Sequence, residues 1–110
     1  MRRPWEVTFL GGLFIAAGSL AGLYHATHGT LDRWMPVILL VEVVAIIGGV
    51  FLILGRSWAR WVVLGWQAFH VVVGALNSIS AALAHAVLLA AIAYFLLTPP
   101  ASLYFRRAPQ

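Results

Sequence analysis

Three ionisable side chains lie inside runs of the sequence that are otherwise apolar: Glu42, His70 and His85. A carboxyl group in hydrocarbon is expected either to keep its proton or to pair with a histidine, because an uncompensated charge there is costly. Glutamate and imidazole can exchange protons near neutral pH and can ligate a metal ion, and imidazole can ligate haem. These residues could therefore handle protons, bind a metal ion or bind a tetrapyrrole, provided that the fold brings them together.

Other polar and small residues accompany them at helical spacing. Steps of three and four residues keep side chains on one face of a helix, and they link Gln67, His70, Gly74 and Asn77. The same spacing aligns Glu42 with Ala45, Ile46 and Gly49. In the first span it aligns Gly12, Ala16 and Ser19, and it also pairs Gly18 with Gly22. Small residues let membrane helices approach closely, so we expect these stripes to face inward.

Depth gives a second prediction about the polar residues. At about 1.5 Å per helical residue, four of them fall roughly 10 Å below the outer ends of their helices, in one layer: Ser19, Glu42, His70 and His85. His25 and His28 lie at the outer rim. The plainer interpretation is that the buried polar residues only hold helices together by hydrogen bonds, and that the rim histidines only meet water.

Composition identifies the class of protein. Of the 110 residues, 63% are hydrophobic and 9% are charged, whereas soluble domains are about 45–50% apolar and about 25% charged. We expect a single integral membrane domain over residues 1–110. The chain has no cysteine, which excludes disulfides, thiolate chemistry and iron–sulfur clusters. The net charge of +4 is carried by arginines near helix ends, which argues against nucleic-acid binding.

Four segments are long enough to cross a bilayer, which takes about 20 apolar residues: 7–24, 34–54, 58–76 and 79–98. The predicted fold is an all-α, antiparallel bundle of four transmembrane helices. Helix-end signals support the boundaries. Asp32 and Pro36 begin the second span, Gly55 ends it and Ser57 caps the third. Asn77 or Ser78 caps the fourth, and Pro99 and Pro100 end it.

The arginines predict the orientation. All except Arg33 fall on one side of the four spans, at Arg2, Arg3, Arg56, Arg60, Arg106 and Arg107. Because positive residues concentrate in cytoplasmic segments, both termini are expected in the cytoplasm, with the protein in a bacterial inner membrane. Aromatic residues form an expected interfacial belt on that side: Trp5, Trp58, Trp61, Tyr104 and Phe105. Residues 1–22 also have the character of a signal peptide, but we expect them to remain as the first span.

Four functions are compatible with these features. The favoured one is a non-catalytic accessory or assembly module, a homo-oligomer or a subunit of a larger membrane complex. The second is a carrier or channel for a proton, metal ion or small solute. The third is a subunit that binds haem or a chlorin through His70, His85 or His25, since Ala81–His85 and Ala21–His25 have the spacing of chlorophyll-ligand segments. An enzyme is not expected, because no catalytic motif is present, and no cofactor is expected.

The second half of the chain carries a resemblance. It contains "WARW" at the start of the third span, "AFH" within it, an early histidine in the fourth span and an aromatic–arginine tail. In these features it resembles small four-span bacterial membrane proteins without assigned function, and it is loosely similar to DoxX-like proteins. The resemblance implies four spans and marks His70 and His85, and it implies no activity.

Overall fold

The computed structural model describes residues 3–29 and 33–110, and this part of the chain forms five α-helices. They are α1 (Trp5–His28), α2 (Met35–Ile53), α3 (Ser57–Asn77), α4 (Ile79–Leu97) and α5 (Ala101–Arg107). The first four are long and apolar enough to cross a membrane. The prediction of an all-α protein with four candidate spans is therefore confirmed.

Several predicted helix ends are also confirmed. Pro36 lies in the first turn of α2, and Gly55 follows α2 with a left-handed φ of 81°, which favours glycine. Ser78 caps α4, because its hydroxyl oxygen accepts a hydrogen bond from the Ala81 N–H at 3.1 Å. Helix α1 continues beyond the predicted end at residue 24, and Asp32 lies outside the described residues.

The predicted cap at Ser57 is wrong. Ser57 is the first residue of α3, Arg56 is its N-cap, and no side-chain cap bond forms there. The Ser57 N–H instead donates to the side-chain oxygen of Gln110 at 2.8 Å. The Gln110 amide nitrogen in turn donates to the Gly55 carbonyl at 2.8 Å, so the C-terminal segment is attached to the turn between α2 and α3.

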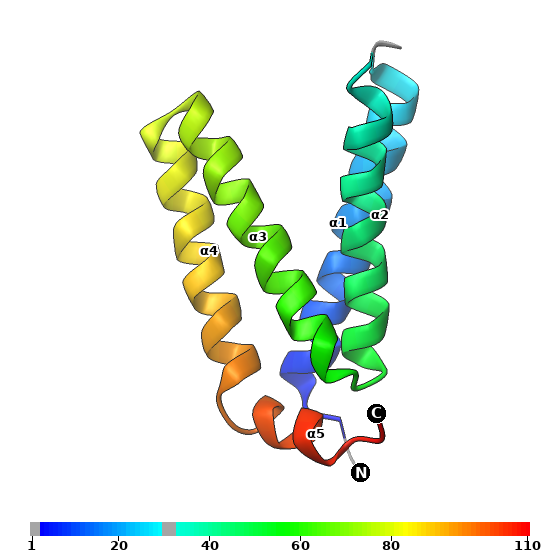
Figure 1. Cartoon of the computed structure of the whole chain (residues 1–110), viewed down its shortest axis with the longest axis vertical. Coiled ribbons are helices and arrows are strands. Elements are labelled where there is room, and N and C mark those ends of the chain that lie inside the picture. Colours follow the sequence, from blue (N-terminus) through cyan, green and yellow to red (C-terminus); the bar gives the residue numbers. More distant parts are fainter. Residues whose placement is uncertain (1–2, 30–32) are drawn as a thin grey trace.

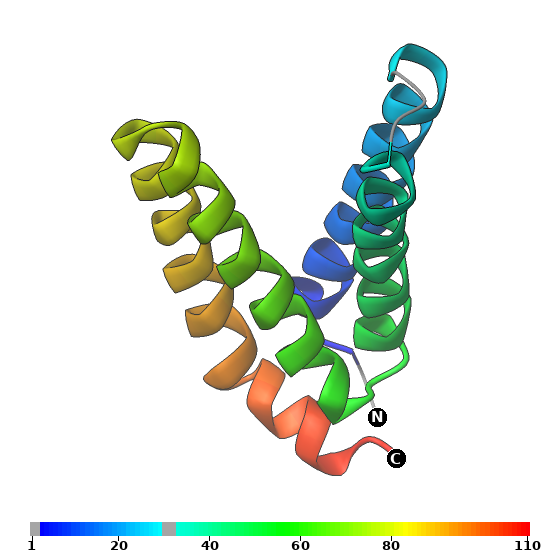
Figure 2. The same cartoon turned by 45° about the horizontal axis from the view of Figure 1, so that its top comes forward.

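The four long helices form two hairpins that diverge as a V (Figures 1 and 2). Helix α1 packs against α2, and α3 packs against α4. The hairpins meet at the end that holds α5, the start of α1 and the α2–α3 turn, which we call the closed end. They separate toward the α1–α2 and α3–α4 connections, which form the open end. The bundle is thus less closed than the sequence suggested.

A buried apolar cluster fills the closed end. It joins residues from all five helices, with Val7, Leu10, Leu52, Val63, Leu96 and Phe105 among its members. Tyr104 and Phe105 belong to it, so they pack inside the protein and do not contribute to the interfacial belt that was predicted for them. They are buried because α5 places Ala101, Tyr104, Phe105 and Ala108 on one face, which packs on the hairpins. Helix α5 was not predicted.

Glycines control the contact between α1 and α2. A Cβ atom at Gly49 would lie 2.5 Å from the carbonyl oxygen of Gly11, and one at Gly18 would lie 2.7 Å from the carbonyl oxygen of Glu42. These distances leave no room for a side chain, so only glycine permits the approach. The stripe of Glu42 therefore faces α1, as predicted.

The stripe of Gly12, Ala16 and Ser19 on α1 is exposed, and the expectation that it faces inward is wrong. The buried face of α1 is the neighbouring one, which carries Val7, Leu10, Gly11, Phe14 and Gly18. Helix α1 has two sets of small residues, and the set with Gly11 and Gly18 meets complementary glycine and alanine positions on α2.

Candidate functional site

Glu42 is the most unusual side chain of the structure. It lies two turns into α2, and only 9% of its surface is exposed. The close approach of Gly18 and Gly22 of α1 covers one side of it, with the Cβ of Glu42 3.7 Å from the position that a Cβ at Gly22 would take. Within residues 3–29 and 33–110, the carboxyl group has no hydrogen bond and no ion pair. The buried side-chain atoms without a partner there belong to Glu6 and His25, so the Glu42 carboxyl oxygens keep accessible surface although the residue as a whole is buried.

The carboxyl group faces a cavity between the two hairpins, which we call the α2–α3 cavity. Its volume is about 290 Å³. Helix α2 contributes Glu42 and three aliphatic residues, α3 contributes His70 with two apolar residues, and α1 contributes His25. The full lining is His25, Val37, Ile38, Val41, Glu42, Phe69, His70 and Val73. Two of the three ionisable residues singled out in the sequence thus share one apolar chamber.

His70 has a defined tautomer. Its Nδ1 lies 2.9 Å from the carbonyl oxygen of Trp66, one turn earlier in α3. Because a carbonyl oxygen only accepts hydrogen bonds, Nδ1 carries the proton and the neutral ring leaves Nε2 with a free lone pair. The imidazole also packs on the Trp66 indole, with ring centroids 3.9 Å apart. These two contacts fix the ring, and Nε2 remains available as an acceptor.

His85 has the opposite tautomer. The side-chain nitrogen of Gln67 lies 3.1 Å from both the His85 carbonyl oxygen and its Nδ1. Since the carbonyl requires a donor, the Gln67 nitrogen donates, and Nδ1 of His85 accepts. Gln67 is 4% exposed and joins α3 to α4. His85 and Gln67 line a separate cavity of about 250 Å³ among α1, α3 and α4.

Helix α3 separates the two cavities. His70 faces the α2–α3 cavity and His85 faces the other, with their ring centroids 5.8 Å apart. His70 therefore neighbours both Glu42, on one cavity, and His85, across α3, but the three side chains do not meet in one site. Among the described residues, no group of three or more His, Cys, Asp or Glu side chains is placed to hold a metal ion.

The remaining predicted site residues are distributed around this region. Ser19 is exposed on α1, and Asn77 is exposed at the end of α3, where its amide donates to the Val73 carbonyl of its own helix at 2.9 Å. His28 is exposed and stacks on Tyr24. His25 is half-buried and lines the α2–α3 cavity, and its Nδ1 is buried without a partner in the described part of the chain.

Sequence reasoning overlooked Trp66, which holds the two hairpins together. Its indole N–H donates to the Val41 carbonyl of α2 at 2.8 Å, and its ring meets the edge of Phe14 of α1 at a centroid distance of 5.3 Å. The indole lines the cavity at His85. Its position was a usable signal, because tryptophan in membrane proteins concentrates at the interfaces and this one lies in the middle of a span.

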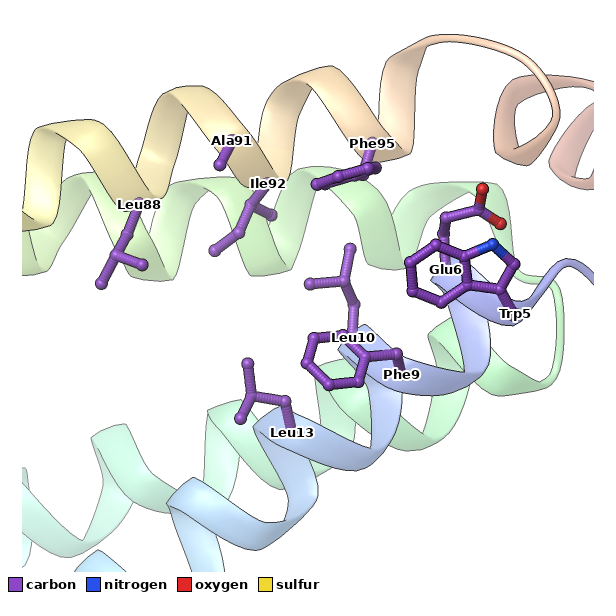
Figure 3. A pocket seen from close by; sticks show the side chains of 9 residues that line it. All are labelled: Trp5, Glu6, Phe9, Leu10, Leu13, Leu88, Ala91, Ile92 and Phe95. Carbon is purple, nitrogen blue, oxygen red and sulfur yellow. The ribbon is translucent and has the colours of Figure 1, made fainter.

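A third cavity lies between α1 and α4, on the side away from Glu42. This α1–α4 groove has a volume of about 330 Å³ and is lined by Trp5, Glu6, Phe9, Leu10, Leu13, Leu88, Ala91, Ile92 and Phe95 (Figure 3). Glu6 is its only ionisable residue. One oxygen of Glu6, Oε2, is buried and has no hydrogen-bond partner among the residues that the structure describes.

Comparison of the chain with family models, with curated proteins and with solved structures gives no match.

Proposed function

We propose that this protein is a multi-pass protein of a bacterial inner membrane and a non-catalytic module that packs against the transmembrane helix of a partner. The arrangement of charge supports the membrane orientation. The closed end carries Arg3, Arg56, Arg60, Arg106 and Arg107, so the positive-inside rule places this end and both termini in the cytoplasm. Arg33 lies near the start of α2, at the opposite end.

The observation that carries the proposed assembly role is the unpaired surface of α1 and α4. In lipid, apolar area alone does not drive helix association, and close approach of small residues does. The exposed stripe of Gly12, Ala16 and Ser19 offers such an approach, and nothing lies within 4 Å of a Cβ placed on Gly12. The stripe borders the α1–α4 groove, and α4 itself has only Ile92 and Leu96 buried.

The position of Glu6 suggests that the partner helix carries a basic residue. The Oε2 of Glu6 has no partner within residues 3–29 and 33–110, and it lies at the end of the groove that we assign to the cytoplasmic side. A partner helix that brings an Arg or Lys side chain to this level would satisfy the carboxylate, as charge-assisted hydrogen bonds are strong at a partly dry interface. The partner is thus expected to end in a basic residue on its cytoplasmic side.

Site-directed cross-linking tests the assembly role. The chain has no cysteine, so single-cysteine variants report one position each. In native membranes, Ala16→Cys should cross-link to a partner helix, and the product mass distinguishes a second copy from another protein. Val43→Cys, on an exposed part of α2, serves as the control. Equal cross-linking from both positions, or none from Ala16→Cys, would contradict the proposal.

A steric variant tests the same surface independently. Gly12→Leu should dissociate the complex, because it fills the stripe, while leaving the isolated chain folded. Gly65→Leu is the matched control, since a Cβ at Gly65 also meets nothing within 4 Å and lies on α3, away from the stripe. An intact complex in Gly12→Leu would exclude this stripe as the interface.

The unpartnered carboxyl group of Glu42 favours one second candidate, a carrier for a proton or small solute. If the protein is a carrier, Glu42→Gln should abolish a pH-dependent flux into liposomes. Glu6→Gln, which alters the other membrane-embedded carboxyl group, should leave that flux intact. An unchanged flux in Glu42→Gln would count against transport through the α2–α3 cavity.

A further inference from the structure

The α2–α3 cavity has the character of a ligand site that is separate from the surface assigned to a partner. It lies on the α2–α3 side of the molecule, and the α1–α4 groove lies on the other side. Most of its wall is aliphatic or aromatic, and its polar atoms converge from three helices. Small-molecule sites typically combine an apolar wall with a few placed polar groups.

The polar groups that line the cavity can accept hydrogen bonds, and no described residue of the cavity donates to them. Glu42 is nine-tenths buried with no partner in the described chain, and His70 presents the lone pair of Nε2 because Nδ1 is held by the Trp66 carbonyl. His25 adds a buried Nδ1 that has no partner among the residues the structure describes. A carboxyl group and an imidazole lone pair together favour a ligand that donates hydrogen bonds and carries positive charge.

The arrangement disfavours a bare metal ion. A metal ion needs several ligands at about 2.0–2.6 Å, and no three ionisable side chains among the described residues are grouped closely enough. The cavity volume of about 290 Å³ also exceeds what one ion fills. The ligand must therefore bring bulk of its own to the apolar walls.

Depth adds a further requirement. Glu42 lies seven residues beyond Met35, the first residue of α2, which corresponds to a depth of about 10 Å. A strongly hydrated cation would lose its water shell there, and the cavity offers too few ligands to replace that water. An ammonium group attached to an apolar body loses less, because the body enters the aliphatic part of the cavity and Phe69 offers an aromatic ring near the charge.

We propose that the α2–α3 cavity binds a small lipophilic amine in its ammonium form, with Glu42 as the counter-ion and Nε2 of His70 as the second acceptor. Val37, Ile38, Val41 and Val73 surround the apolar body. Binding of this kind requires neither a partner helix nor transport, and it gives a role to a carboxyl group that faces a cavity without a partner among the described residues.

The test uses the full chain in lipid nanodiscs, with isotope-labelled glutamate. The sequence has only two glutamates, Glu6 and Glu42, so each side-chain carboxyl signal can be assigned with one variant. Phenethylamine is the probe. Phenethyl alcohol has the same body without the charge, and methylamine has the charge without the body. We expect phenethylamine to shift the Glu42 signal saturably, and both controls to bind about tenfold or more weakly.

Variants separate this site from partition of the probe into lipid. Glu42→Gln and His70→Leu should each weaken phenethylamine binding by about tenfold, measured by isothermal titration calorimetry because Glu42→Gln lacks the reporting carboxyl group. His85→Leu alters the other cavity and should leave the affinity unchanged, and Glu6→Gln should do the same. Helix content by circular dichroism verifies that each variant is folded. Equal binding of the alcohol, an unshifted Glu42 signal, or equal loss of affinity in His85→Leu would each overturn the proposal.

Discussion

The contact within the first hairpin and the contact between the two hairpins are built from different residues. Helices α1 and α2 meet through glycines, with backbone facing backbone at Gly11 and Gly49. Between the hairpins, the contact nearest the polar layer is a large side chain, Trp66, which reaches across to a carbonyl of α2. Glycine contacts leave no space, and a bulky aromatic contact holds helices apart and leaves cavities beside it.

The difference explains where polar chemistry can exist in so small a helical protein. The glycines of α1 cover the Glu42 backbone, and the divergence of the hairpins leaves its carboxyl group facing the α2–α3 cavity. In a closed bundle, a carboxyl group at position 42 would be fully buried and would need a hydrogen-bond partner within the protein. The cavities on either side of α3 are therefore a consequence of the way the hairpins are joined.

Gly49→Ala should have the largest effect, because it breaks the tighter of the two contacts. The new Cβ would lie 2.5 Å from the Gly11 carbonyl oxygen and 3.1 Å from the Ile15 nitrogen, and backbone atoms cannot give way cheaply. We expect a loss of about 1–3 kcal/mol in the free energy of unfolding, which outweighs the gain in helix propensity of up to about 1 kcal/mol. A titration with a denaturing detergent measures this change in the free energy of unfolding.

Gly65→Ala is the control for this prediction. A Cβ at Gly65 meets nothing within 4 Å, so this variant should be neutral or more stable by up to about 1 kcal/mol. If both variants changed stability equally, helix propensity rather than close approach would govern the glycine positions.

Trp66→Phe should have an intermediate effect, confined to the contact between the hairpins. It keeps an aromatic ring and removes the indole N–H that donates to Val41, so we expect a loss of about 0.6–2 kcal/mol and a wider V. Spin labels on Leu23→Cys and Ser80→Cys, at the open end, report the separation by pulsed electron resonance.

Trp61→Phe serves as the matched control for the tryptophan. Its side chain is 59% exposed at the closed end and should not alter the distance between the labels. An unchanged distance in Trp66→Phe would show that the packing at the closed end alone sets the angle.

The sequence predicted the elements of this fold better than their mutual arrangement. Span lengths, Gly55, Pro36 and Ser78 are local signals, and local signals fix where helices begin and end. The choice between the two small-residue stripes of α1 was not local, because Gly12 and Gly18 look equally suited to a close contact. Only the complementary shape of α2 selects the face that carries Gly18.

The candidate site was predictable only where it depends on local sequence signals. Helical periodicity and depth place Glu42 and His70 at one level, and the structure places both on one cavity. The separation of His85 from them depends on the side of α3 that α4 occupies, which is a tertiary choice. Helix α5 did leave a usable signal: the spacing of Ala101, Tyr104, Phe105 and Ala108 is that of a buried helix face.

Gln67→Leu should have the smallest effect and shows whether the polar contacts inside the second hairpin matter for its stability. It removes the hydrogen bonds from the Gln67 amide to His85, while Gly74 still lets α3 and α4 approach at Ala81. Interhelical hydrogen bonds in membranes contribute about 0.6 kcal/mol on average, so a loss of that order is expected in the unfolding titration. Asn77→Leu, which removes a bond within α3 only, should change stability less. A loss in Gln67→Leu as large as that in Gly49→Ala would mean that hydrogen bonds hold the second hairpin as strongly as close packing holds the first.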